Sequence, residues 1–111
     1  MDRFYSYCRN EDNGIGFIPH DGTRVKNTFG LTLYVFHSNE TYDYKNGKGK
    51  SWWYVVEERT GLAMGRGHTR KEAIDNALTA INMRGVESIK QDIEDAVAKH
   101  GLPPHLQPTY L

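Results

Sequence analysis

The sequence has a single cysteine, no long apolar run and no excess of charge of either sign. Because Cys8 is the only cysteine among the 111 residues, no disulfide can form within the chain. A helix that crosses a membrane needs about 20 consecutive apolar residues, and we find neither such a run nor a signal-peptide pattern. We therefore expect a cytoplasmic protein that does not associate with membranes.

Basic residues are not in surplus. The chain has 14 Lys and Arg residues and 14 Asp and Glu residues, so its formal net charge is zero. Proteins that bind nucleic acid mainly by neutralising phosphates usually carry a basic surplus. Binding of nucleic acid would therefore depend on local groups of Lys and Arg side chains.

Motifs for metal binding and catalysis are missing as well. The five histidines lack the cysteine partners and the His-Glu-x-x-His spacing of a zinc site: His20, His37, His68, His100 and His105. Glu57 and Glu58 are adjacent, so in a strand they point to opposite faces and cannot form a carboxylate pair. If the protein were an enzyme, the best candidates for general acid–base catalysis would be His37, Asp43 and His68. We expect no metal, no cofactor and no enzymatic activity.

The clearest structural signal is a helix start at Thr69. The hydroxyl of Thr69 can accept from the backbone N–H of Glu72, and the Glu72 carboxylate can reach back to the N–H of Thr69, which makes a capping box. Apolar residues then recur at steps of three and four: Ile74, Ala77, Leu78 and Ile81. This pattern predicts a helix over about 70–84 that ends where Gly85 can adopt a positive φ.

A second helix is predicted directly after the first, over about 86–100. Its apolar stripe consists of Val86, Ile89, Ile93, Ala96 and Val97. Lys99 and His100 place positive charge in the last turn, and Gly101 supplies the stop. We expect residues 102–111 to form an extended tail.

The first part of the chain, residues 3–64, carries the signals of strands and turns. Strand formers gather in four segments: 3–8, 31–38, 52–58 and 62–64. A further hairpin is predicted with its tip at His20-Asp21-Gly22, where Pro19 would restrict the strand to an edge position. Residues 39–50 are rich in turn formers and lysine, and they predict a long solvated connection.

Together these elements predict one α+β domain over residues 1–111. An antiparallel sheet of three to five strands would occupy residues 3–64, because successive strands joined by turns pair in antiparallel fashion. The two helices would then pack on one face of this sheet.

Two interpretations are open for Gly65-Arg66-Gly67, which precedes the first helix. A glycine-rich turn before a helix exposes backbone N–H donors to an anion, and the side chains of Arg66, Arg70 and Lys71 would add positive charge. Alternatively, the glycines solve a geometric problem at a plain connection from strand to helix, and we favour this second interpretation.

Aromatic residues supply the better functional signal. Between residues 34 and 54 the chain has more of them than the helix-covered face of a small sheet needs: Tyr34, Phe36, Tyr42, Tyr44, Trp52, Trp53 and Tyr54. Part of this set could lie on an open face or in the 39–50 connection and bind a partner. Further strands or the C-terminal tail could instead cover that face.

We predict a non-catalytic protein that binds another protein through this aromatic surface. The predicted anchors are Tyr42, Tyr44, Trp52 and Trp53. The alternative prediction is a nucleic-acid binder whose phosphate contacts come from Lys45, Lys48, Lys50, Arg66, Arg70 and Lys71. The oligomeric state is open, a homodimer included.

The stretch from residue 52 to residue 81 resembles known families. Trp53-Tyr54-Val55-Val56, Gly61 and Gly67-His68-Thr69-Arg70-Lys71-Glu72-Ala73, followed by Ala77 and Ile81, resemble HicB-type antitoxin domains and the small phage proteins called ABA-sandwich domains. Residues 65–73 are also similar to the last strand and helix of double-stranded RNA-binding domains. All these resemblances imply a βββα arrangement.

Each resemblance implies a different function. Similarity to RNA-binding domains implies that Arg70 and Lys71 face phosphates, and similarity to HicB implies an antitoxin. Similarity to small phage proteins implies a binder or inhibitor of a host or defence protein. We favour the last of these by analogy of fold.

Overall fold

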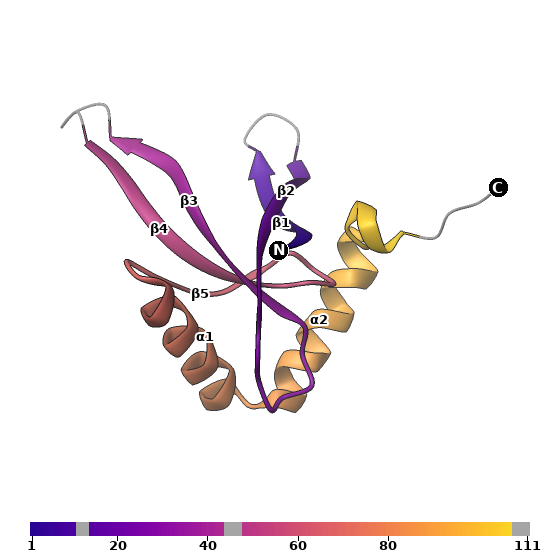
Figure 1. The fold of residues 1–111 in the computed structure, drawn as a ribbon. Coiled ribbons are helices and arrows are strands. Elements are labelled where there is room, and N and C mark those ends of the chain that lie inside the picture. Colours follow the sequence, from indigo (N-terminus) through magenta and orange to yellow (C-terminus); the bar gives the residue numbers. More distant parts are fainter. Residues whose placement is uncertain (11–13, 44–47, 108–111) are drawn as a thin grey trace.

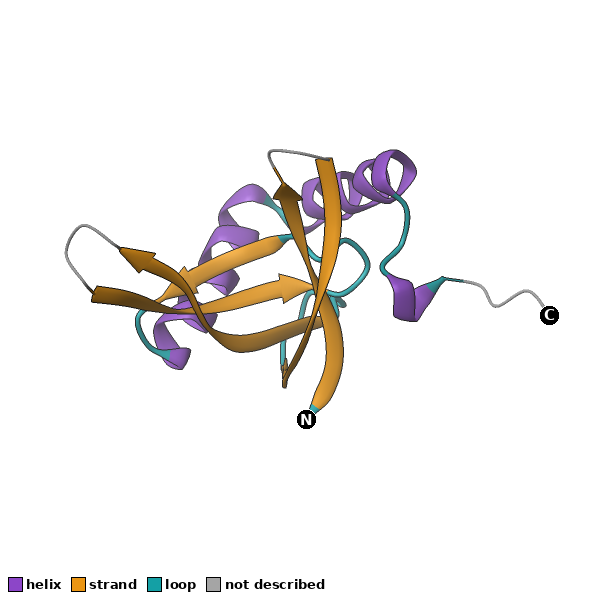
Figure 2. Cartoon of the chain, turned by 90° about the horizontal axis from the view of Figure 1, so that it is seen from above, coloured by secondary structure: helices purple, strands orange, loops and turns teal. Residues whose placement is uncertain are grey.

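The computed structural model describes residues 1–10, 14–43 and 48–107, and the side chains of residues 1–7, 16–38 and 52–107. Its elements are β1 (Asp2–Asn10), β2 (Gly14–Val25), β3 (Leu33–Asp43), β4 (Lys48–Glu57), β5 (Ala63–Gly67), α1 (Arg70–Arg84), α2 (Val86–His100) and a short 3₁₀ turn, η1 (Pro104–Leu106). The five strands are antiparallel and lie in chain order in one sheet. Both helices pack on one side of the strands (Figure 1, Figure 2). The predicted α+β architecture is confirmed.

Strand β2 changes its pairing partner at Gly22. Residues Gly14–Gly22 pair with β1, whereas Thr23–Val25 pair with β3. A Cβ atom on Gly22 would lie 2.4 Å from the carbonyl oxygen of Val35 and 2.7 Å from the ring of Phe4, so only glycine lets β2 pass this close to the sheet. The hairpin β1–β2 consequently crosses the face of the sheet that lies opposite the helices (Figure 1).

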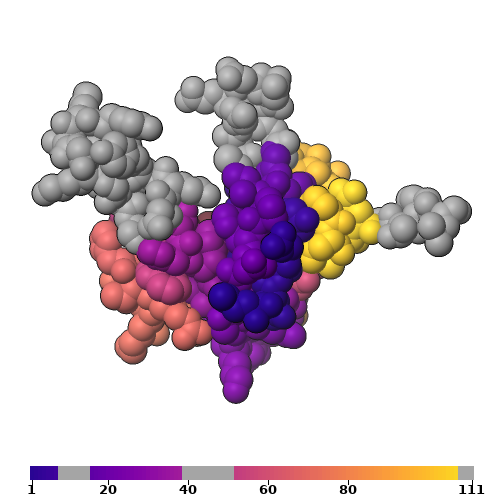
Figure 3. Space-filling view, turned by 45° about the horizontal axis from the view of Figure 1, so that its top comes forward, coloured from indigo at the N-terminus to yellow at the C-terminus, as the bar shows by residue number. Residues whose placement is uncertain are grey.

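The other edge of β1 reaches the turn between β4 and β5. The backbone N–H of Tyr7 donates to the carbonyl oxygen of Gly61 at 2.8 Å. The C-terminal turn η1 also lies against β1 (Figure 3), where the ring of His105 stacks on that of Tyr5 with 5.3 Å between centroids. The hairpin is therefore fixed at β3, at the β4–β5 turn and at the C-terminal segment.

Two apolar layers result, one on each face of the sheet. The larger layer lies between the sheet and the helices and contains Val25, Leu31, Leu33, Val35, Val55, Ala73, Ala77, Ile81, Ile89 and Ile93. Because alternate residues of a strand point to opposite faces, their neighbours Tyr34, Phe36 and Val56 belong to the second layer. This alternation explains why both faces of β3 and β4 are apolar.

The second layer is aromatic and is covered by the hairpin. The ring of Phe4 in β1 is fully buried. It is parallel to the ring of Tyr34, with 4.8 Å between centroids, and tilted against the ring of Phe36, with 5.4 Å between centroids. His20 in β2 stacks on Phe36 at 4.0 Å. For Tyr34 and Phe36, the interpretation that further strands cover the aromatic face is therefore correct.

Helix α1 has the predicted start. The backbone N–H of Glu72 donates to the hydroxyl of Thr69 at 3.1 Å, which satisfies one of the N–H groups left free in the first turn. The helix ends at Arg84, and Gly85 has a φ of +92°, so the chain turns directly into α2. The predicted bounds of both helices are confirmed.

The two glycines of β5 let α1 approach the strand closely. A Cβ atom on Gly65 would lie 2.5 Å from the amide nitrogen of Ala77, and a Cβ atom on Gly67 would lie 2.7 Å from that of Ala73. The geometric interpretation of Gly65-Arg66-Gly67 therefore accounts for both glycines. The Asn76 side chain adds a hydrogen bond from Nδ2 to the carbonyl oxygen of Arg66 at 2.9 Å.

The hairpin tip predicted at His20-Asp21-Gly22 is wrong. These residues lie inside β2 and pair with Phe4, Arg3 and Asp2 of β1. Pro19 is tolerated because this part of β2 is bonded to β1 alone, so its missing N–H interrupts no second ladder.

The long connection predicted over 39–50 is also wrong. Strand β3 continues to Asp43 and β4 begins at Lys48, with Thr41 paired to Lys50 and Tyr42 to Gly49. The turn formers and lysines of residues 39–50 have a low intrinsic preference for strands, but pairing between β3 and β4 overrides that preference.

Two further boundaries differ from the prediction. The sheet ends at Gly67 rather than at residue 64, because β5 continues along β4 until it reaches the start of α1. The tail is not wholly extended, since Pro104–Leu106 form η1.

Candidate functional site

Trp52 lies at the centre of a partly exposed group of aromatic and cationic side chains. The ring of His68 stacks on Trp52 with 4.2 Å between centroids, and the guanidinium carbon of Arg66 lies 4.7 Å from the centroid of the Trp52 ring. Arg66 and His68 are exposed, whereas Trp52 and Tyr54 are half-buried. We call Trp52, Tyr54, Arg66 and His68 the Trp52 cluster.

The strand register explains why these side chains meet. Tyr54 pairs with Arg66 across β4 and β5. Gly65 and Gly67 face α1, so Arg66 between them must face the opposite side, where Tyr54 joins the aromatic layer. Stacking on Trp52 then limits the rotation of the Arg66 side chain through a cation–π contact.

Arg66 forms no ion pair with any carboxylate among the described side chains. Among the described residues, four Arg and Lys side chains do form ion pairs: Arg3 with Asp21, Arg59 with Glu94, Lys71 with Asp75 and Arg84 with Asp92. Within the described ranges, neither Arg66 nor Arg70 makes such a pair. At the described junction of β5 and α1, the two unpaired positive charges of Arg66 and Arg70 therefore exceed the one negative charge of Glu72, although the whole chain is neutral.

A cavity of about 200 Å³ lies beside the Trp52 cluster, between the hairpin β1–β2 and strands β3 to β5. We call it the hairpin cleft. Its apolar lining includes Ile18, Phe36, Tyr54 and Val56, and its polar lining includes Ser6 and Ser38. The Ser6 hydroxyl is 2.8 Å from Nε2 of His20. Tyr54 lines the cleft and pairs with Arg66 across β4 and β5, so the cleft borders the Trp52 cluster.

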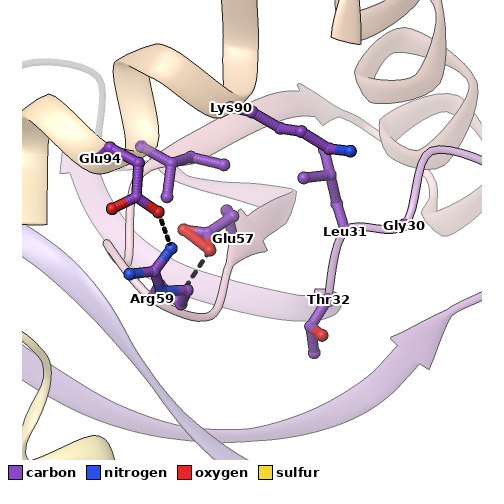
Figure 4. A pocket seen from close by; sticks show the side chains of 8 residues that line it. Gly30, Leu31, Thr32, Glu57, Arg59, Lys90 and Glu94 are labelled. Atoms are coloured by element: carbon purple, nitrogen blue, oxygen red, sulfur yellow. Dashed lines mark hydrogen bonds and ion pairs between the residues drawn. The ribbon is translucent and has the colours of Figure 1, made fainter. Parts of the chain in front are cut away.

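A second cavity of about 240 Å³ lies on the other side of the molecule, between α2, the loop at Gly30 and the end of β4 (Figure 4). Its most buried polar group is Glu57, which is 2 % exposed. The Glu57 carboxylate accepts hydrogen bonds from the N–H of Arg59 at 2.8 Å and from the N–H and hydroxyl of Thr60 at 2.8 and 2.7 Å. Burial raises the pKa of Glu57 above its ordinary value near 4.5, although these bonds oppose the rise.

The charged groups of this second cavity hold the turn between β4 and β5. All three donors to Glu57 come from the two residues that follow Glu58, so the carboxylate closes the turn from inside. The Arg59 guanidinium pairs with Glu94 on α2, which ties the same turn to the helix (Figure 4). Glu57 is therefore a structural group.

The predicted anchors do not form one surface. Trp53 points to the opposite face from Trp52 and packs against the core beneath the helices. Its ring contacts that of His37, with 4.9 Å between centroids. Tyr42 lies in β3, but its side chain is outside the described residues, and Tyr44 is wholly outside them. Of the four anchors, the structure thus places Trp52 in the Trp52 cluster.

The predicted phosphate-binding residues are divided in the same way. Arg66 belongs to the Trp52 cluster, while Arg70 and Lys71 are exposed in the first turn of α1. Lys48 and Lys50 lie in β4 with side chains outside the described residues, and Lys45 is wholly outside them.

The groups considered for catalysis do not converge. His37 contacts Trp53 on the helix side of the sheet, whereas His68 contacts Trp52 on the other side. The side chain of Asp43 is not described. Among the described residues, no three His, Cys, Asp or Glu side chains are grouped as a metal site would require.

The hairpin cleft and the contacts of Arg66 and His68 with Trp52 were missed from the sequence. A usable signal was present: Gly65 and Gly67 are two residues apart, so they share one face of a strand, and Ala73 and Ala77 are four apart, so they share one face of a helix. Residues that alternate with helix-facing glycines must face away from the helix.

Comparison with known proteins gives no functional assignment. No protein-family model, curated protein or solved structure matches this chain. Neither helix in the described part of the chain combines the length and hydrophobicity needed to cross a bilayer. Function must therefore be argued from the surfaces described above.

Proposed function

We propose that the protein is a non-catalytic binding protein that holds another protein through the Trp52 cluster. The observation that carries this proposal is the stacking of the half-buried Trp52 ring with the exposed side chains of His68 and Arg66. Tryptophan, tyrosine and arginine are the residues that most often dominate protein interfaces. A ring that is already fixed by its neighbours also loses little conformational freedom on binding.

We further propose that the partner is a host or defence protein and that the chain acts as an inhibitor or modulator of it. The support is the small sheet-and-two-helix architecture together with the resemblance of residues 52–81 to small phage proteins. This support is an analogy of fold. A HicB-like antitoxin is the alternative on the same residues, and a gene for a small toxin beside this one would favour it.

Affinity capture from a lysate of the source cell tests the Trp52 cluster. The wild-type protein and a Met83→Ala variant should recover the same partner, since Met83 is 82 % exposed on α1, away from the cluster. Trp52→Ala should reduce recovery by about tenfold or more, the loss expected for a dominant interface residue. Equal recovery by Trp52→Ala would discard the cluster as the anchor.

Binding of nucleic acid is a second candidate function, favoured by the absence of a carboxylate partner for Arg66 and Arg70 within the described ranges. Fluorescence anisotropy with labelled duplex RNA, duplex DNA and single strands at several salt concentrations would test it. Each lost phosphate contact should lower the salt slope by about 0.7 to 0.9. Arg66→Gln with Arg70→Gln should show this change, whereas Arg84→Gln should not, because Arg84 is paired with Asp92. No binding at low salt would exclude this function.

A further inference from the structure

We infer that the hairpin cleft receives one aromatic side chain of the partner protein, while Arg66 binds a carboxylate next to that side chain. The inference rests on the proposed function and narrows the partner to a segment with an aromatic residue beside an acidic one. Three properties of the surface support it: the size of the cleft, the state of its polar groups and the positive charge of Arg66 beside the cleft residue Tyr54.

The size of the cleft suits a single ring. Its volume is about 200 Å³, and an apolar cavity of about 150 Å³ is enough to admit benzene. The rings of Phe36 and Tyr54 are nearly parallel, with 5.7 Å between centroids and 24° between planes. They offer the aromatic surface against which another ring packs well, and Ile18 and Val56 add aliphatic surface.

The polar groups of the cleft favour an aromatic side chain over a nucleic-acid base. Ser6 is already engaged with His20 at 2.8 Å, and Ser38, which is 6 % exposed, also has an interaction partner. A base carries several donors and acceptors at its edge, and each one buried without a partner costs about 1 to 3 kcal/mol. The ring of Phe or Tyr brings at most one such group.

The positive charge of Arg66, the strand neighbour of the cleft residue Tyr54, favours an acidic neighbour of that ring. Arg66 is the register partner of Tyr54, and such cross-strand neighbours have Cβ atoms about 4.5 to 5.5 Å apart. The guanidinium carbon of Arg66 lies 4.7 Å from the centroid of the Trp52 ring, and the group has five N–H donors, two of which can bind a carboxylate. An acidic residue within about two positions of the ring residue would reach it.

Titration of the ¹⁵N-labelled full chain with capped peptides tests the inference by NMR. The first probe is Gly-Asp-Phe-Asp-Gly, the second has alanine in place of phenylalanine, and the third has asparagine in place of both aspartates. The first should shift the amide signals of Ser6 and Val56 and the side-chain Nε signal of Arg66. The second should leave the cleft signals unchanged, and the third should leave the Arg66 signal unchanged.

Two variants localise the site. Ala63 is an exposed residue of the cleft lining, and Ala63→Leu adds bulk there. This variant should bind the first peptide with about tenfold lower affinity. Ala80→Leu makes the same change on an exposed part of α1 and should have no effect. Arg66→Gln should remove the preference for the acidic peptide over the asparagine peptide, whereas Arg24→Gln should retain it. If Ala63→Leu does not fold, the three titrations of the wild type remain the test.

Several outcomes would overturn the inference. Equal cleft shifts with the alanine peptide would show that no ring enters, and the absence of cleft shifts with every peptide would show that the cleft does not bind such a segment. Cleft shifts with a thymidine dinucleotide but not with the peptides would identify the occupant as a base. If lysate capture depends on Trp52 but not on Ala63→Leu, the cleft inference fails while the proposed function stands.

Discussion

Gly65 in β5 lies against the backbone of Ala77 in α1, so closely that a Cβ atom on the glycine would come within 2.5 Å of the alanine nitrogen and 2.7 Å of its Cα. This contact sets how near the helix approaches the sheet. It also determines that Arg66, the next residue, projects from the other face toward Trp52.

Replacing Gly65 by alanine should therefore destabilise the fold. We expect Gly65→Ala to lower the free energy of unfolding by about 1 to 3 kcal/mol, the usual cost of an overpacked contact, in urea denaturation. The atoms nearest to the added Cβ are the backbone nitrogen and Cα of Ala77, so a second substitution, Ala77→Gly, should not restore stability. Recovery of stability in Gly65→Ala with Ala77→Gly would contradict this explanation.

Removing the cap of α1 should have a smaller effect. Thr69→Ala deletes the acceptor for the N–H of Glu72 and should cost about 1 kcal/mol of stability. Thr79→Ala makes the same chemical change at an exposed position inside α1, where alanine is the better helix former, and should be neutral or slightly stabilising. Thermal denaturation of both variants distinguishes a cap from a general effect of threonine, and equal losses would count against the cap.

Truncating Phe4 should uncover the aromatic layer. Phe4 is 0 % exposed, and Phe4→Ala should lower the free energy of unfolding by about 3 to 5 kcal/mol, as for other large core residues. Met83→Ala, at an exposed position, should change it by less than about 0.5 kcal/mol. A loss below about 1 kcal/mol for Phe4→Ala would mean that the hairpin contributes little to covering Tyr34 and Phe36.

The burial of Glu57 should make stability depend on pH in a definite direction. Because burial raises the pKa of Glu57, the folded state binds its proton more tightly than the unfolded state does. The contribution of Glu57 to stability is then largest below about pH 4.5 and falls as pH rises toward and through the raised pKa. The difference in unfolding free energy between wild type and Glu57→Gln should therefore decrease as pH rises from about 4.5 to the raised pKa and stay level at higher pH.

High salt provides a control for this pH dependence. The cause is burial of the carboxylate rather than attraction between exposed charges, so the decrease should persist when salt screens surface pairs. If the difference in unfolding free energy between wild type and Glu57→Gln increased with pH, the hydrogen bonds from Thr60 and Arg59 would lower the pKa of Glu57 by more than burial raises it.

Local signals in the sequence were sufficient for the helices. The start of α1 depends on Thr69 and Glu72, which are three residues apart, and its end depends on the positive φ of Gly85. These interactions occur within one turn of the chain, so no knowledge of distant residues is needed to predict them.

The strands could be predicted only in part, because their bounds depend on partners far away in the sequence. Residues such as Thr41 and Lys50 join a ladder because each has the other opposite. The crossing at Gly22 depends on the carbonyl of Val35 and the ring of Phe4. The sequence contains no local mark for such contacts.

The candidate site shows the same division. Trp52 could be named from its aromatic surroundings, but its contacts with Arg66 and His68 depend on the register between β4 and β5. The hairpin cleft depends on where β1 and β2 lie over the sheet. Both follow from pairing between strands.

During synthesis on the ribosome, β1 and β2 emerge well before the residues that hold them in place. Phe4 can be packed only after Tyr34 and Phe36 have been synthesised, and the N–H of Tyr7 can be bonded only after Gly61 has been synthesised. Until then the nascent hairpin presents an apolar side and an unpaired edge, features that promote association between incomplete chains. Rapid elongation or chaperone contact over this interval would favour correct folding of the N-terminal part.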